Sequence, residues 1–242
     1  MGATLHHTES HDSGAEKAPT GTSLSPLHAI PGFDRLSRRK RYAKGSALLV
    51  EGQPARGVYV LCAGRAKIAI TSAEGRKLIV RIARPGDLLG IHATLSGHSY
   101  ETTAETLTPC EVDFISRRQL LELLDKEKSY GLRIAIAVSK EFSEFVEQAR
   151  VLLLSPVAAE KLAGLLLNWG EAFGQPTTSG LLFKTLLTHE ELGQMIGASR
   201  ETVTRTLNML KRRQIIRALN GDIWIRNTVA LASIAKVRSE LI

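Results

Sequence analysis

Three charged side chains, at positions 200, 201 and 205, carry the most specific chemistry in this sequence. They lie in Ser199-Arg200-Glu201-Thr202-Val203-Thr204-Arg205, where helical spacing places two arginines and a glutamate on one exposed face. Arginine can donate two hydrogen bonds to the major-groove edge of guanine, and glutamate can accept one from the amine of cytosine. A helix that serves only to fold has little use for this set, so the segment predicts a base-reading surface.

Two short helices and a turn are predicted to hold this surface. Thr188-His189-Glu190-Glu191 has the form of a capping box and begins a helix that ends near Ile196. Gly197-Ala198 supplies the turn, and Ser199 is the predicted N-cap of the second helix. The predicted buried face of that helix is Val203, Leu207 and Leu210. The predicted DNA-binding residues are Ser199, Arg200, Glu201, Thr204, Arg205, Asn208 and Lys211.

A β-hairpin is predicted directly after the second helix. Ile215–Leu219 and Ile223–Ile225 flank Asn220-Gly221, which is a favoured dipeptide of type I′ hairpin turns. Helix, glycine turn, helix and hairpin together predict a winged helix-turn-helix, with its second helix presented to the major groove.

The charge of the chain fits a nucleic-acid partner. The formal net charge is +8 and the sequence pI is about 9.7. Between positions 200 and 217 a single acid, Glu201, stands among six basic residues: Arg200, Arg205, Lys211, Arg212, Arg213 and Arg217. A second basic cluster, from Arg35 to Lys44, is interpreted as a solvated surface at the entry of a strand.

The composition of the chain indicates a globular protein rather than a membrane-spanning or secreted one. The 242 residues can hold two modest domains, and the mean hydropathy of −0.03 is typical of a globular protein. The longest apolar runs are too short to span a membrane, and no signal peptide is predicted, so we expect a cytoplasmic protein with no membrane partner. Cys62 and Cys110 give no disulfide framework.

The N-terminal half is predicted to contain a polar tail followed by a β domain. Residues 1–24 have no periodicity and predict a disordered tail, in which His6, His7 and His11 lack the fixed spacing of a metal site. Short apolar segments separated by glycines then predict an antiparallel barrel or jelly roll. These segments are Ala47–Val50, Val58–Leu61, Ala66–Thr71, Leu78–Ala83 and Cys110–Ile115, with a turn at Arg84-Pro85-Gly86-Asp87.

A long helical pattern runs from about Arg117 to Leu154. One apolar stripe recurs at alternating spacings of 3 and 4 and predicts a dimer seam: Leu132, Ala135, Ser139, Phe142, Val146, Ala149 and Leu153. A second stripe lies beside it: Ile134, Val138, Phe145 and Leu152. The two stripes favour a helix that packs against its own domain with one stripe and against the same helix of a second copy with the other. The alternative is one wide stripe that faces its own core.

The prediction as a whole is an α+β chain with four parts. Ser155-Pro156 breaks the long helix and is predicted to start the next, with Ser155 as N-cap, and that helix leads near Glu171 into a polar loop over Gly174–Gly180. The predicted parts are a tail (1–24), a jelly-roll-like β-roll sensor domain (25–125), a dimerisation helix (126–154) and a winged helix-turn-helix domain (155–242).

Residues from about 26 to 231 resemble the CRP/FNR family of bacterial transcription regulators. Two segments carry the resemblance: Gly197-Ala198 with the adjoining segment Ser199–Arg205, and Pro85-Gly86-Asp87-Leu88-Leu89-Gly90 in the predicted roll. Family members carry a cyclic-nucleotide-binding-type β-roll, a long dimerisation helix and a C-terminal winged helix-turn-helix. The resemblance therefore implies a homodimeric regulator that binds double-stranded DNA, works with RNA polymerase and is not an enzyme.

The resemblance also implies a DNA site. By this resemblance, Arg200 and Arg205 read guanines and Glu201 reads cytosine. The implied site is a palindrome of TGTGA-like half-sites one helical turn apart. The chain is similar to CRP-type members at Arg200 and to FNR-type members at Thr204, where those have serine.

The effector is not identified by the sequence, although a small molecule fits the resemblance. Cyclic-nucleotide-binding relatives have a glutamate after the glycine matched by Gly90 and an arginine at or beside the position of Tyr100. Here Ile91 and Tyr100 replace them, and Glu101 would repel a phosphate, so cyclic AMP is not expected. The effector-pocket candidates are Gly90, Ile91, His92, His98, Tyr100 and Glu101.

Three further possibilities involve a metal or a metal-containing cofactor. An iron–sulfur cluster needs several thiolates; Cys110 matches the internal cluster cysteine of FNR-type members, but no cysteine precedes Pro31, so Cys110 is interpreted as a buried strand residue. Haem remains an alternative because His92 and His98 lie where relatives place loop ligands. A cupin-like metalloenzyme would need converging histidines and acids such as His92, His98, Glu101 and Glu105, yet it leaves the winged domain unexplained. No catalytic residues and no metal ligands are therefore predicted, and the cofactor is unknown.

Overall fold

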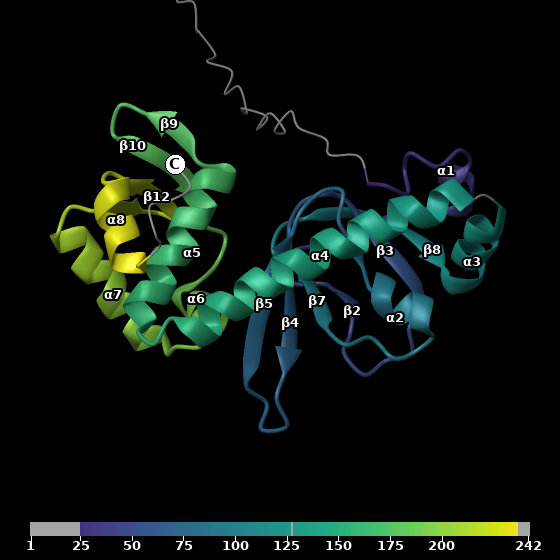
Figure 1. Ribbon diagram of the computed structural model, residues 1–242, viewed down its shortest axis with the longest axis horizontal. Coiled ribbons are helices and arrows are strands. Elements are labelled where there is room, and N and C mark those ends of the chain that lie inside the picture. The colour runs from purple at the N-terminus through teal and green to yellow at the C-terminus, as the bar shows by residue number, and fades with distance from the viewer. Residues whose placement is uncertain (1–24, 127, 237–242) are drawn as a thin grey trace, which may run out of the picture.

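A computed structural model describes residues 25–126 and 128–236. It has the predicted α+β architecture: a β domain, a long helix and a C-terminal domain of helices with a small sheet (Figure 1). The polar tail predicted over residues 1–24 lies outside the described residues.

The β domain consists of two four-stranded antiparallel sheets, here called the β-roll. One sheet has the order β1 (Arg38–Tyr42), β8 (Cys110–Ser116), β3 (Gly57–Ala63) and β6 (Leu88–Leu89). The other has the order β2 (Ala47–Leu49), β7 (Thr103–Thr106), β4 (Ala66–Thr71) and β5 (Lys77–Ala83). Apolar side chains from both sheets, including Leu61, Val112 and Ile68, form a common core.

All five predicted strands are present, as β2, β3, β4, β5 and β8. Residues 84–87 form the predicted turn: the N–H of Asp87 donates to the Arg84 carbonyl at 3.0 Å, and Gly86 has a φ of 99°. The short strands β6 and β7 and the helix α2 (Ile91–Ser96) were not predicted. Strand β1 is formed by the middle of the basic cluster. It lies at the exposed edge of its sheet, where its charged side chains discourage pairing with another sheet.

Helices connect the roll to the C-terminal domain. The helical pattern over 117–154 corresponds to two helices, α3 (Arg117–Lys126) and α4 (Lys128–Leu154). Leu120 and Leu123 of α3 and Ile134 of α4 pack with Phe33 of the short helix α1 (Phe33–Leu36) in one apolar cluster. Helix α4 then crosses the molecule from the roll to the C-terminal domain (Figure 1).

The predicted start of the next helix was wrong. Helix α5 spans Ala158–Phe173, and its N-cap is Val157, in an extended conformation, rather than Ser155. Ser155 precedes a proline, which disfavours the helical region for its backbone, so Ser155 and Pro156 belong to the link between α4 and α5.

The predicted polar loop over Gly174–Gly180 was also wrong. Gln175–Thr177 forms β9, which pairs with β10 (Gly180–Lys184). The side chains of β9 are all exposed and polar or proline, so no apolar alternation revealed the strand. Backbone pairing with β10, itself paired to the hairpin of β11 (Ile216–Leu219) and β12 (Asp222–Ile225), completes a four-stranded sheet.

Candidate DNA interface and effector cavity

The helix-turn-helix is built from α6 (His189–Ile196) and α7 (Arg200–Arg212). The Thr188 hydroxyl accepts from the Glu191 N–H at 3.2 Å, and the Glu191 carboxylate accepts from the Thr188 N–H at 2.9 Å, so the predicted capping box is present. Gly197 ends α6 in the left-handed region with a φ of 65°, and the Ser199 hydroxyl caps α7 by accepting from the Thr202 N–H. Local chemistry therefore sets the angle between the two helices.

Removing this cap is expected to destabilise the protein. Thr188→Ala leaves the first N–H groups of α6 without the hydroxyl and should lower the free energy of unfolding by about 0.5–2 kcal/mol. Urea unfolding measures the change. Thr188→Ser keeps the hydroxyl and should recover most of the loss, and equal losses in both variants would contradict the capping role.

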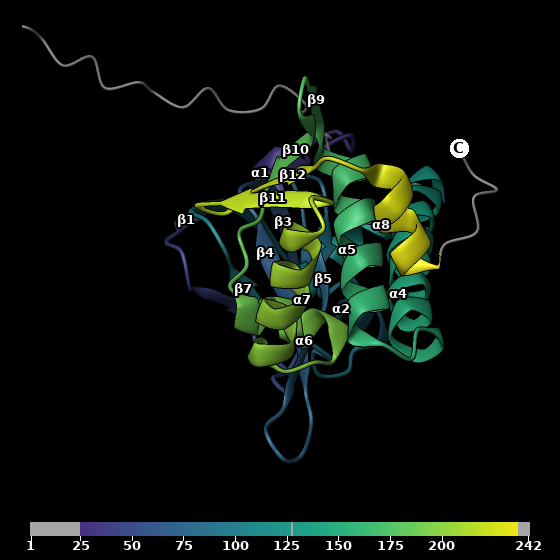
Figure 2. The ribbon, with the colours of Figure 1, turned by 90° about the vertical axis from the view of Figure 1, so that its left-hand side faces the viewer.

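The predicted division of α7 into two faces is confirmed for its buried side. Val203 and Leu210 are fully buried and Leu207 nearly so, in the core of the C-terminal domain. Arg200, Glu201, Arg205, Asn208 and Lys211 are exposed. In Figure 2 α7 lies between α6 and the hairpin β11–β12. Its N-terminal half thus presents both arginines and the glutamate together.

Thr204 is less free than its neighbours on α7. Its hydroxyl donates to the Arg200 carbonyl at 2.9 Å and lies 2.8 Å from Nδ1 of His189 in α6. Burial lowers the pKa of His189, helped by the nearby charges of Lys211 and Arg200, which favours a neutral ring at neutral pH. Since the Thr204 hydroxyl already donates to a carbonyl, Nδ1–H donates to Thr204 and links the two helices.

Glu201 keeps its negative charge at the exposed start of α7. Hydrogen bonds from its own backbone N–H and from Ser199 lower its pKa, with a smaller contribution from the Arg200 charge. An ionised carboxylate is the form that accepts from a cytosine amine.

The hairpin after α7 has the predicted type I′ turn. Asn220 and Gly221 both have positive φ, at 51° and 86°, between paired strands β11 and β12. The Arg217 guanidinium lies over the Trp224 ring at 5.1 Å on this hairpin. The wing therefore adds an exposed basic side chain to those of Arg212 and Arg213 at the end of α7.

Helix α4 exposes an apolar surface along the predicted seam. Leu132 is 66% exposed, Phe142 is 62% exposed and Leu153 is 81% exposed. Ala135, Ser139 and Val146 are exposed as well, and Ala149 is half-buried. From the second stripe Ile134 is buried and Val138 half-buried, whereas Phe145 is 52% exposed. Ile136, which the sequence prediction missed, is 61% exposed on the same helix.

A cavity of about 360 Å³ lies between the β-roll and α4. Four effector-pocket candidates line it: Gly90, Ile91, His92 and Glu101. His98 is exposed, and Tyr100 is buried beside the cavity without lining it: its ring packs against Gly90, and its hydroxyl donates to the Gly57 carbonyl at 2.7 Å. The structure therefore brings together four of the six candidates. Phe142 and Phe145 of α4 complete the wall.

Sequence reasoning missed the charged cluster at this cavity. Arg81 of β5 makes ion pairs with Asp87 at 2.7 Å and with Glu141 of α4 at 2.8 Å. His92 lies 3.9 Å from the other oxygen of Glu141. Glu141 lies 60 residues after Arg81, and Asp87 lies in the turn that follows β5, so no helical or strand periodicity revealed the cluster.

Glu141 is expected to make stability depend on pH. Burial raises its pKa from 4.5 to about 7, although Arg81 opposes the shift. The folded state therefore binds more protons than the unfolded state between these values, and the free energy of unfolding should fall as pH rises from 4.5 to about 7. Glu141→Gln should flatten that part of the profile, measured by urea unfolding at each pH. An unchanged slope would contradict the assignment.

The C-terminal domain is held against the roll by polar contacts. Lys67 of β4 pairs with Glu105 at 2.9 Å and with Glu191, the capping residue of α6, at 2.8 Å. Gln148 of α4 donates to the Met195 carbonyl at 2.7 Å. The helix-turn-helix thus contacts both the long helix and a strand whose next residue, Ile68, lines the cavity.

Cys110 is a buried strand residue, as predicted. Its thiol donates to the carbonyls of Arg65 and Thr108 at 3.3 Å, and burial raises its pKa.

These features define a class of protein with a sensor roll, a connecting helix and a winged DNA-reading domain. The model of the cyclic nucleotide-binding domain matches residues 39–127, and the model of the Crp-like helix-turn-helix domain matches residues 160–234. The chain belongs to the CRP/FNR family and is a DNA-binding transcription regulator.

Among its relatives, the fumarate and nitrate reduction regulatory protein of Yersinia pestis is 29% identical over 212 residues, which are 86% of this chain and 83% of that protein. The solved structure of FixK2 from Bradyrhizobium japonicum has a TM-score of 0.71 at 22% identity and covers 82% of this chain and 96% of that one. A CooA mutant from Carboxydothermus hydrogenoformans has a TM-score of 0.75 at 18% identity, over 88% of this chain and 97% of its own. Within residues 25–126 and 128–236, no helix is both long and apolar enough to cross a membrane.

Proposed function

We propose that the chain acts as a homodimer that reads a palindrome of TGTGA-like half-sites through α7. The observation that carries this proposal is the joint exposure of Arg200, Glu201 and Arg205 on the first half of α7. Ser199, Asn208 and Lys211 are exposed at either end of that set, and Thr204 orients it through His189. Double-stranded DNA is the partner, with RNA polymerase as the expected second partner and the cytoplasm as the place of action.

The apolar surface of α4 supports the dimer. Large apolar side chains on one helix face are costly to leave exposed to water. In a two-fold dimer the α4 helices of the two copies would pack together and bury these side chains on both. A two-fold dimer places its two reading helices about one DNA turn apart, which requires half-sites with that spacing.

A selection experiment tests the proposed site. Full-length protein is incubated with random duplexes, and bound DNA is sequenced after repeated rounds. Enrichment of inverted TGTGA-like half-sites supports the proposal. Enrichment of a single half-site or of an unrelated sequence overturns it.

The proposed effector site is the cavity between the roll and α4. Cyclic AMP is not the proposed ligand, since Ile91 stands where relatives place glutamate and Tyr100 is bonded to Gly57. Arg81 also lines the cavity, but Asp87 at 2.7 Å already neutralises its charge, and its other terminal nitrogen lies 2.8 Å from Glu141. Most of the lining is apolar, including Leu49, Val80, Leu88 and Leu89, which suits a small, largely apolar ligand.

A ligand in this cavity would act by changing the relative populations of two orientations of the DNA-binding domains. It would touch Phe142 and Phe145 of α4 and lie next to Ile68, whose neighbour Lys67 binds the capping residue of α6. Such contacts change DNA binding only if the ligand prefers one orientation of the reading heads.

A further inference from the structure

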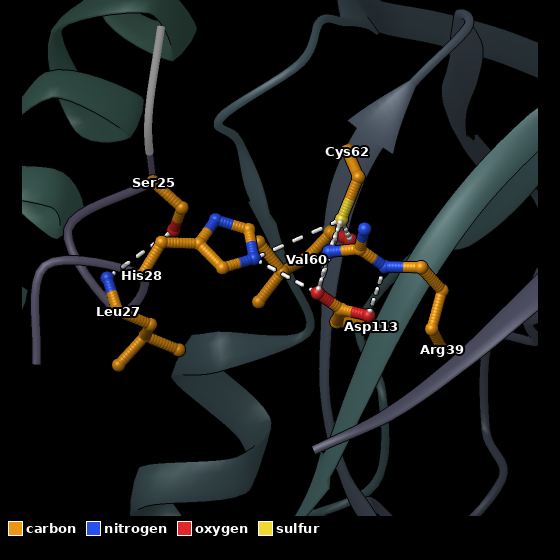
Figure 3. A network of polar contacts seen from close by, with 7 residues as sticks. All are labelled: Ser25, Leu27, His28, Arg39, Val60, Cys62 and Asp113. Atoms are coloured by element: carbon orange, nitrogen blue, oxygen red, sulfur yellow. Dashed lines mark hydrogen bonds and ion pairs between the residues drawn. The ribbon is translucent and has the colours of Figure 1, made fainter. Parts of the chain in front are cut away.

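A polar cluster remote from the DNA face joins three segments that are distant in sequence. His28 precedes α1, Cys62 lies in β3 and Asp113 lies in β8 (Figure 3). Among the side chains that the structure describes, these three form a group of histidine, cysteine and acidic residues able to surround one metal ion. Spacings of 34 and 51 residues hide the group from sequence inspection.

The three ligand atoms lie within about 0.5 Å of the separations found in a tetrahedral zinc site. His28 Nε2 lies 2.8 Å from Asp113 Oδ2, the Cys62 Sγ lies 3.3 Å from the same oxygen, and Sγ lies 3.8 Å from Nε2. Tetrahedral zinc with bonds of about 2.0–2.3 Å places such atoms roughly 3.3–3.6 Å apart. Only small movements are needed to admit an ion.

Neighbouring groups orient these ligands. Asp113 is nearly fully buried, and its Oδ1 accepts from Arg39 Nε at 2.9 Å. The Phe33 ring packs edge-on against the His28 ring, with centroids 5.2 Å apart. Second-layer contacts of this kind hold metal ligands in place.

We propose that His28, Cys62 and Asp113 bind a divalent ion of the zinc class, with water as a fourth ligand. Nitrogen, sulfur and oxygen donors together suit zinc. Binding releases the Cys62 proton to solvent and requires the Nδ1–H form of the His28 ring, so the proton between Nε2 and Asp113 moves through solvent to Nδ1. Arg39 Nη2, now 2.7 Å from Asp113 Oδ2, withdraws while its Nε keeps Oδ1. Arg39 is half-exposed, so it can make this movement.

The ion would fasten the segment before α1 to the roll. Leu27 and Ile30, next to His28, pack with Leu120 of α3 and Ile134 of α4. The site therefore connects an ion to the start of the long helix, and the inference stands whether or not the proposed DNA half-site is correct.

Metal titration of the full-length protein tests the proposal. The chelator-treated protein is titrated with Co²⁺ and with Zn²⁺, and metal content is measured after dialysis. We expect one equivalent bound and a thiolate-to-cobalt charge-transfer absorption. Cys62→Ser and His28→Gln should each weaken binding roughly 100-fold, while keeping polar contacts to Asp113. Cys110→Ser, the matched control at the other cysteine, should bind like the natural protein.

Three results would overturn the site. The first is binding of less than one equivalent, or absence of the charge-transfer band. The second is an equal loss of binding in Cys110→Ser, and the third is full retention of binding in Cys62→Ser. Because the chain also contains His6, His7 and His11, the titration is repeated with all three replaced by asparagine. Loss of the thiolate band in that variant would also contradict the proposal.

Discussion

Leu132→Asp is expected to convert the proposed dimer into a monomer and to abolish tight binding to a palindromic duplex. Leu132 is 66% exposed on α4, and burial against a partner helix would stabilise the dimer by about 1.5–3 kcal/mol per copy. Each copy of the variant loses this stabilisation, and the two new carboxylates would face each other across one interface. The dimer dissociation constant should rise at least about 100-fold. Sedimentation equilibrium measures it, and fluorescence anisotropy measures DNA affinity.

The control is Arg133→Asp, which introduces the same carboxylate at the next exposed position. It points about 100° away around the helix and should leave the dimer intact. A Leu132→Asp protein that stays dimeric would show that α4 does not pair through the predicted seam. The single wide stripe facing its own core is already disfavoured by the exposure of Phe142 and Leu153.

The proposed DNA-reading face could be predicted because the chemistry that builds the helix-turn-helix is local. Thr188 and Glu191 lie three residues apart, Asn220 adjoins Gly221, and Val203, Leu207 and Leu210 repeat at helical spacing. Each of these sequence patterns depends only on residues within one or two helical turns of one another. Strand β9 was missed because backbone pairing, rather than a side-chain pattern, determines it. The start of α5 was missed because Pro156 keeps Ser155 out of the helical region, so both residues belong to the link before the helix.

The proposed effector cavity could be predicted only in part, because most of its contacts are not local in sequence. Gly90 and Ile91 were found by resemblance, but the acidic partners of Arg81 come from a turn and from α4. Tyr100 was predicted to belong to the pocket, and it packs beside the cavity against Gly90, with its hydroxyl hydrogen-bonded to Gly57, 43 residues away. Contacts between distant segments carry no spacing signal, and the His28, Cys62 and Asp113 cluster is the extreme case.

Arg200→Ala is expected to lower DNA affinity and to remove a base preference at one position of each half-site. A bidentate arginine–guanine contact is worth about 1–3 kcal/mol of discrimination, so the affinity ratio between matched and substituted sites should fall roughly 5- to 150-fold. Anisotropy titrations with a palindrome and with single-base variants measure this ratio. The protein should keep its fold because Arg200 is exposed on α7.

Arg212→Ala is the matched control for this test. Arg212 is exposed in the last turn of the same helix, where a phosphate contact is expected rather than a base contact. Its loss should weaken matched and mismatched duplexes alike and reduce the salt dependence of binding by about one counterion. If Arg200→Ala also weakened all duplexes equally, Arg200 would contact phosphate. If affinity and base preference both stayed unchanged, Arg200 would not contact the DNA, and the TGTGA-like half-site would lose its main support.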